Sequence, residues 1–259
     1  MPSLRRSLLR RYRLFAPYLL RHGLLLLALL LLGDGLSALY FPQLKAALSL
    51  SAPAPTPSSS VPYVAAMTMV LAKDTFQRPD QPYWGTASDG EDWQAGASSQ
   101  HNFVIFNHMG VIEATAQRIY CNALLGPDEK GNVEITFNAS LSQYGASELG
   151  TVLHWRDTSD FYALVLDGQQ LALTRTMDGM QIPLQSVPFP ARAGAFYTFR
   201  FRASGAQLFA MVWPTGQPAP AEWQISVQDN ALSSGQAGLR VVVQNRAQAR
   251  ITAFEEVQL

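Results

Sequence analysis

Residues 150–176 read GTVLHWRDTSDFYALVLDGQQLALTRT, and this stretch predicts two and a half β-strands joined by turns. Leu153 and Trp155 are expected to share one face of the first strand, because alternate side chains of a strand point the same way. The other face takes the intervening Val152, His154 and Arg156. A lone hairpin is only marginally stable in water, so further strands must cover this one.

The two turns of this stretch are built from residues that favour turns. The cluster Asp157-Thr158-Ser159-Asp160 can accept hydrogen bonds from nearby backbone N–H groups through its short oxygen-bearing side chains. A strand over residues 161–167 is expected to follow, and Gly168-Gln169 then leads into a strand over 171–176. The pattern is that of an antiparallel meander.

Similar short strands are expected through the rest of residues 74–259, and no segment of ten residues there has the periodicity of a helix. Residues 132–141 alternate most regularly, with apolar side chains at the odd positions and polar ones at the even positions. About a dozen strands separated by turns predict an all-β sandwich of two antiparallel sheets. The other expected strands cover residues 102–106, 110–114, 181–187, 197–202, 207–213, 223–227, 238–243 and 250–257.

The formal net charge of zero conceals two unlike parts of the chain. Eight of the 19 Lys and Arg residues but only one of the 19 acids, Asp34, precede Asp74. The remaining 11 basic and 18 acidic residues give the part from Asp74 onward a net charge of −7. An acidic body of this kind argues against nucleic acid as its partner.

The amino-terminal residues 1–41 predict a membrane anchor. Six arginines lie in the basic segment 1–22, and the apolar segment 23–41, with ten leucines, is long enough to span a bilayer as a helix. Ten leucines outweigh the cost of inserting Asp34, which is about 3 kcal/mol. The arginines precede the span, so we expect a cytoplasmic amino terminus and an extracytoplasmic body. The membrane is thus one expected partner.

Two other interpretations of this segment remain open. Leu24–Leu32 also fits the apolar region of a signal peptide, with a cleavage pattern at Ala47-Leu48-Ser49, which would give a secreted protein. Residues 13–48 resemble the first membrane helix of ABC-exporter permeases, although no phosphate-binding loop follows and transport is not expected. A Pro/Ser/Ala-rich linker is predicted over 42–62, and a single domain over 63–259.

The order of several short motifs resembles the concanavalin A-like lectin/glucanase jelly roll, in particular laminin-G-like modules. The resemblance covers nearly all of residues 74–259 and implies a jelly-roll sandwich. Proteins of this superfamily include sugar binders, glycosidases and structural modules, so the fold alone does not determine the function. The matching motifs are D-x-F-x-R at 74–78, W-G-x-A-x-x-G-x-x-W at 84–93, G-x-V-x-x-x-x-x-x-x-L at 131–141, L-x-W-x-D-x-x-x-F-Y at 153–162 and A-F-E-E-V at 253–257.

Catalysis is disfavoured by the distribution of carboxylates. A glycosidase needs two carboxyl groups on one sheet face, about 5–9 Å apart, and the E-x-D-x-x-E pattern of retaining glucanases is not found. Glu134 is flanked on its face by Thr136 and Asn138. Glu255 and Glu256 are adjacent, so they point to opposite faces.

Trp155, Arg156, Asp157, Tyr162 and Arg175 are the candidate ligand-binding residues, because sugars stack on aromatic rings and bond to planar polar groups. The alternative for Trp155 is a place in the core beside Leu153. Arg156 and Arg175 can equally be solvated charges on a sheet face, as can Arg200 and Arg202.

No cofactor and no metal site is predicted. His101, His108 and His154 lack metal-ligand spacing, and the acidic loop 89–92 is interpreted as solvated rather than as a Ca²⁺ site. Cys121 is the single cysteine and is expected to be buried and inert.

Three hypotheses for the function follow. The first is a membrane-anchored extracytoplasmic β-sandwich that binds carbohydrate or another cell-surface ligand without catalysis. The second is a glycoside hydrolase-like enzyme of the same fold. The third is a structural ectodomain of a larger membrane assembly, since Asp34 within the apolar segment favours a polar partner there.

Overall fold

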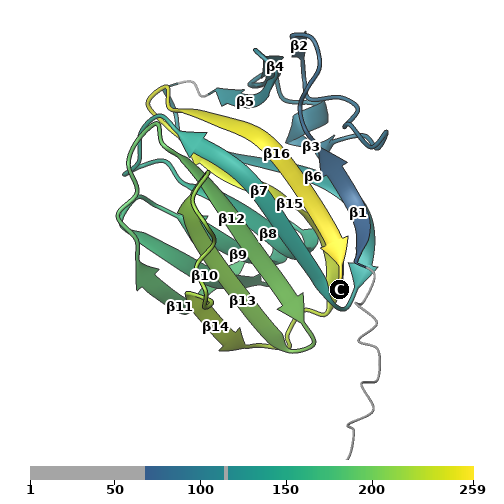
Figure 1. The fold of residues 1–259 in the computed structure, drawn as a ribbon, viewed down its shortest axis with the longest axis vertical. Helices are drawn as coiled ribbons and strands as arrows, with labels where there is room; N and C mark the ends of the chain where they lie inside the picture. The colour runs from purple at the N-terminus through teal and green to yellow at the C-terminus, as the bar shows by residue number, and fades with distance from the viewer. Residues whose placement is uncertain (1–67, 114–115) are drawn as a thin grey trace, which may run out of the picture. The chain divides into compact units, whose positions relative to one another are not determined.

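A computed structural model describes residues 68–113 and 116–259, and these form two antiparallel β-sheets packed face to face (Figure 1). The predicted all-β sandwich is confirmed for this part of the chain. The predicted anchor, cleavage site and linker lie in residues 1–67, outside the described part. Among the described residues, no helix is long and apolar enough to cross a bilayer.

The larger sheet has nine strands in the order β14-β13-β12-β7-β16-β5-β4-β2, and β1 also pairs with β16 (Figure 1). The odd-numbered residues 133–141 of β7 are buried, which confirms the predicted alternation. Its strands are β1 (Met69–Asp74), β2 (Gln81–Pro82), β4 (Phe103–Phe106), β5 (Met109–Glu113), β7 (Val133–Leu141), β12 (Phe196–Ser204), β13 (Gln207–Pro214), β14 (Ile225–Gln228) and β16 (Gln248–Gln258).

The smaller sheet has seven strands in the order β11-β10-β9-β8-β15-β6-β3. One of them, β6, was missed by the sequence analysis, although its apolar residues alternate from Ile119 to Leu125. The strands are β3 (Gln94–Ala95), β6 (Ile119–Lys130), β8 (Leu149–Asp157), β9 (Asp160–Leu166), β10 (Gln170–Met177), β11 (Met180–Pro188) and β15 (Ser234–Val243).

Buried aromatic side chains around Asp74 explain the D-x-F-x-R and W-G-x-A-x-x-G-x-x-W motifs. The Asp74 carboxylate is fully buried and accepts hydrogen bonds from the backbone N–H of Phe76, the guanidinium of Arg78 and Nε1 of Trp93, at 2.6–2.9 Å. The Trp93 ring meets that of Trp84 edge to face at 4.8 Å. A buried charge is tolerated when it is paired in this way.

The central strand β8 contains a β-bulge that changes which way its side chains point. Leu153 pairs with Tyr162 and Asp157 with Asp160, so three residues of β8 lie opposite the single residue Phe161 of β9. His154, at the bulge, adopts a φ of 50°. Side-chain alternation is interrupted within such a bulge, so a residue there points to a different face from the one that regular pairing predicts.

The prediction that Trp155 shares a face with Leu153 is therefore wrong. Leu153 lies in the core between the two sheets. Trp155 instead joins a second apolar cluster on the outer face of the smaller sheet, together with Leu124, Val152, Phe161 and Ala163. Its ring stacks on that of Phe161 at 4.7 Å.

Gly235 of β15 permits the bulge. Its φ is 141°, and a Cβ at this position would lie 2.5 Å from the carbonyl carbon of His154 and 2.7 Å from the backbone nitrogen of Trp155. The strand that faces the bulge thus approaches its backbone more closely than any side chain allows.

Glu256 of β16 is buried at the interior side of the sheet, as expected from its opposite orientation to Glu255. Neither carboxyl oxygen has a hydrogen-bond partner among the described residues, and one of them approaches Gly126 closely. Burial, with a smaller contribution from the charge of Glu129, raises the pKa of Glu256 to about 8. The folded chain therefore favours the protonated acid.

The buried acid predicts a pH-dependent stability. Because the pKa is raised on folding, the stabilisation is complete below the unfolded-state pKa of about 4.3 and is lost as the pH rises towards 8. The loss is at most about 1.4 kcal/mol per pH unit. Urea denaturation of wild type and Glu256→Gln should give similar midpoints near pH 4.5 and a more stable variant at pH 8. Curves that stay parallel over this range would contradict a buried protonated Glu256.

A second prediction concerns the bulge. Gly235→Ala should destabilise the chain by about 2–3 kcal/mol, because the added methyl group meets the β8 backbone at an unfavourable φ. Gly216→Ala is the matched control, since Gly216 also has a positive φ (87°) but open space around it. Thermal denaturation should show a clearly smaller loss for the control; equal losses would mean that the approach to β8 is unimportant.

Candidate functional site on the outer face of the smaller sheet

The five residues predicted to bind ligand do not form one surface. Trp155 is only 7% exposed, beneath its neighbours in the outer apolar cluster. Arg156 and Asp157 are exposed at the end of β8, where Asp157 accepts a hydrogen bond from the backbone N–H of Ser159 in the predicted turn.

Tyr162 and Arg175 lie side by side on β9 and β10, and both contact Asp229. The Tyr162 hydroxyl donates to one carboxylate oxygen at 2.6 Å, and Arg175 forms an ion pair with the other. Backbone N–H groups of Ala231 and Leu232 bond to the same cluster, which fastens the segment after β14 to the smaller sheet.

The pKa values of this cluster reflect its burial. Burial and the hydrogen bond to Asp229 raise the pKa of Tyr162 to about 12. Burial alone would raise the pKa of Asp229, but the hydrogen bonds from Tyr162, Ala231 and Arg175 together lower it below its ordinary value. The phenol thus stays protonated and the carboxylate charged, which suits a structural role.

A groove made of two adjoining hollows runs across the outer face of the smaller sheet. The hollows have volumes of about 130 and 260 Å³ and share Glu148, Val165, Thr174 and Gln181 as common walls. The first is also lined by Arg118, Tyr120, Phe161, Ala163, Thr176, Arg240 and Val242, and the second by Asp167, Gln170, Ala172, Leu173, Pro183, Gln185 and Ser186.

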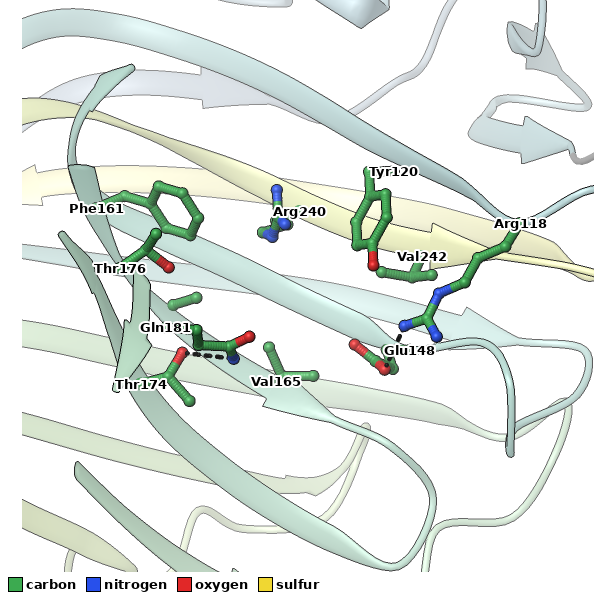
Figure 2. A pocket seen from close by; sticks show the side chains of 11 residues that line it. Arg118, Tyr120, Glu148, Phe161, Val165, Thr174, Thr176, Gln181, Arg240 and Val242 are labelled. Carbon is green, nitrogen blue, oxygen red and sulfur yellow. Dashed lines mark hydrogen bonds and ion pairs between the residues drawn. The ribbon is translucent and has the colours of Figure 1, made fainter. Parts of the chain in front are cut away.

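Figure 2 shows how aromatic and charged side chains meet in the first hollow. Tyr120 on β6 is 52% exposed, and the guanidinium of Arg118 lies 5.3 Å from the centroid of its ring. The guanidinium of Arg240, on the neighbouring β15, lies between two rings, 5.1 Å from the centroid of Tyr120 and 4.9 Å from that of Phe161. Cations over aromatic faces are stabilised by the ring electrons.

Polar side chains complete the walls of the groove. Arg118 forms an ion pair with Glu148 at 3.1 Å, and the side-chain amide of Gln181 donates to the Thr174 hydroxyl at 3.3 Å (Figure 2). These groups come from β6, from the bridge residue just before β8, and from β10 and β11. The groove therefore places the partly exposed ring of Tyr120 beside both hydrogen-bond donors and hydrogen-bond acceptors.

The β8 bulge positions Trp155 against Phe161, which lines the first hollow. Trp155 stacks beneath Phe161 because the bulge turns it outward, and Phe161 in turn supports Arg240. Without the bulge, Trp155 would enter the core and Phe161 would lose its stacking partner. The residue predicted as a platform thus supports the groove from below.

The carboxylates of the groove are already engaged. Asp167 Oδ1 accepts the backbone N–H groups of Gln169 and Gln170 in the turn that precedes β10. Glu148 is held by Arg118. Hydrolysis by a pair of carboxyl groups requires both to face the scissile bond, and these two are instead bonded to Arg118 and to the turn before β10.

The remaining acidic and basic candidates are bound to one another. Glu134 lies on the outer face of the larger sheet between Arg202, at 2.6 Å, and Arg200, at 3.4 Å. Glu255 pairs with Lys73 at 2.8 Å. Within the described ranges, no group of three or more His, Cys, Asp and Glu residues is placed to hold a metal ion.

Burial raises the pKa of Cys121 to about 11, and the thiol accepts a hydrogen bond from the side-chain amide of Asn102. A buried thiol whose pKa is this high stays protonated at neutral pH and is a poor nucleophile. The prediction of a buried cysteine is confirmed.

No family model matches this sequence, and no curated protein matches it either. Solved structures do share its architecture. A xylan β-1,4-xylosidase from Bacillus halodurans is similar with a TM-score of 0.51 at 13% identity, over 71% of this chain and 38% of that one. The GH43 protein BlXynB from Bacillus licheniformis gives 0.52 at 13%, over 72% and 39%.

The catalytic domain of an endo-1,3-β-glucanase (laminarinase) from Thermotoga petrophila is similar over 74% of this chain and 98% of its own length, with a TM-score of 0.50 at 12% identity. This chain spans less than two fifths of the xylosidase and of BlXynB. Identities this low establish a shared fold and no more. Residues 68–113 and 116–259 form a jelly-roll-type sandwich of two antiparallel β-sheets, the fold that these structures share.

Proposed function

We propose that the chain binds a glycan along the groove on the outer face of the smaller sheet, without turning it over. The observation that carries the proposal is the exposed ring of Tyr120 beside Arg240, with the Arg118–Glu148 pair and the Thr174–Gln181 pair in line with it. Sugars bind to sites of this kind because one face of the ring is apolar while its edge carries hydroxyl groups.

Proteins of the same fold support a carbohydrate ligand. They include a laminarinase catalytic domain and a xylan β-1,4-xylosidase. Binding without catalysis is favoured for this chain because Glu148 and Asp167, the two carboxylates of the groove, are already bonded to Arg118 and to backbone N–H groups of the turn before β10.

The amino-terminal predictions belong to the same proposal. An anchor over residues 23–41 would hold the sandwich outside the cell, where glycans are abundant, and cleavage after a signal peptide would release it there instead.

Tyr120 provides the sharpest test. Tyr120→Ala should weaken glycan binding by about 1–2 kcal/mol, roughly 5- to 30-fold, because the ring that stacks against the sugar is lost. The thermal midpoint should change little, since half of the side chain is already exposed. Isothermal titration calorimetry with a ligand found on a glycan array measures the first effect, and circular dichroism the second.

Phe106→Ala is the matched control, because Phe106 is 59% exposed on β4 in the other sheet. Its affinity should equal that of the wild type. Unchanged affinity in Tyr120→Ala would place the binding site elsewhere. Release of reducing sugars from the bound glycan would instead establish the hydrolase hypothesis.

A further inference from the structure

Arg240 is partly buried without a carboxylate to neutralise it. Nη1 donates to the side-chain oxygen of Asn122 at 3.0 Å, and no ion pair is formed with any described residue within 4.0 Å. The other partly buried arginines differ in this respect, since the guanidinium groups of Arg78, Arg175, Arg200 and Arg202 all contact carboxylates. Keeping an unpaired charge away from water costs free energy.

Burial also lowers the pKa of Arg240 below its ordinary value, which is consistent with that cost. A guanidinium has five N–H donors, and Asn122 is the one acceptor found for this group among the described residues. None of its nitrogens is both buried and without a partner. The N–H groups that do not bond to Asn122 therefore remain accessible from the groove.

The side chains that line the first hollow carry one positive charge more than negative charges, and this charge is on Arg240. Arg118 and Glu148 form a pair with each other, so Arg240 is the positive charge left unbalanced among the residues that line this hollow. The surrounding body is acidic, with a net charge of −7 from Asp74 onward. A positive site on an acidic surface favours ligands whose negative charge is localised at one position.

We propose that the groove selects glycans that carry an anionic substituent, a carboxylate or a sulfate ester, which pairs with the guanidinium of Arg240. The sugar that bears it packs on the ring of Tyr120, and neutral residues of the glycan extend past Thr174 and Gln181 into the second hollow. The planar guanidinium can bind either anion with two parallel hydrogen bonds. This inference rests on the proposed glycan binding and specifies its ligand.

The test is an array on which each glycan is present in three forms: with a uronic acid, with that carboxylate reduced to the alcohol, and with the alcohol as a sulfate ester. The full chain should prefer at least one anionic form to the matched alcohol by 10-fold or more. The better of the two anionic forms identifies the substituent. Equal binding of all three forms would overturn the inference and leave glycan binding intact, whereas binding to none would overturn the proposed function as well.

Two substitutions probe the charge itself. Arg240→Gln should reduce the preference for the anionic form over the alcohol form by about 10- to 100-fold, as expected for the loss of a charge-assisted hydrogen bond. Arg250→Gln is the control, because Arg250 is exposed on β16 of the other sheet. It should bind the anionic form as the wild type does.

Glu148→Gln should have the opposite effect. It removes the negative charge of the first hollow and frees Arg118, so the preference for the anionic form over the alcohol form should increase several-fold. Glu148 is partly exposed and lies just before β8, so this variant is expected to fold. An unchanged preference in Glu148→Gln would refute the proposal, and this test remains available even if Arg240→Gln proves unstable.

Discussion

The bulge in β8 is the constraint on which the candidate site depends. Regular pairing of β8 with β9 ends at Leu153, where His154 takes a positive φ and the strand gains two residues relative to its partner. Trp155 consequently stacks under Phe161 on the outer face, and Phe161 supports Arg240. The neighbouring strand tolerates this only because Gly235 has no side chain. The bulge thus determines how side chains of β8, β9 and β15 meet on the outer face.

Much of the fold could be predicted from the local sequence, because apolar and polar residues alternate in each regular strand. In β7 the odd residues are buried and the even ones face outward, as two-residue periodicity requires. The hairpins at Asp157–Asp160 and at Asp178-Gly179 also formed where turn residues indicated. The bulge could not be predicted in this way, because periodicity assumes that every residue takes one step along the strand.

The site was harder to predict than the fold, because its members are distant in sequence. Tyr120 and Arg240 become neighbours only through the pairing of β6 with β15, more than a hundred residues apart. Tyr162 and Arg175 were predicted from their chemistry as two of five ligand-binding residues. Their partner Asp229 comes more than fifty residues later. It bonds to both side chains, and this contact holds the segment after β14 against the smaller sheet. The alternation of Ile119–Leu125 was a usable signal for β6.

The larger sheet has a consequence for how the protein is made. β16 bonds to β1, β5 and β7, so it lies at the centre of that sheet although Gln248–Gln258 is synthesised after all of them. Until this segment has been synthesised, β1 has no partner strand, and β5 and β7 each lack a neighbour along one edge. The larger sheet therefore cannot be completed before β16 is available, and its first strands must wait for a pairing that is distant in sequence.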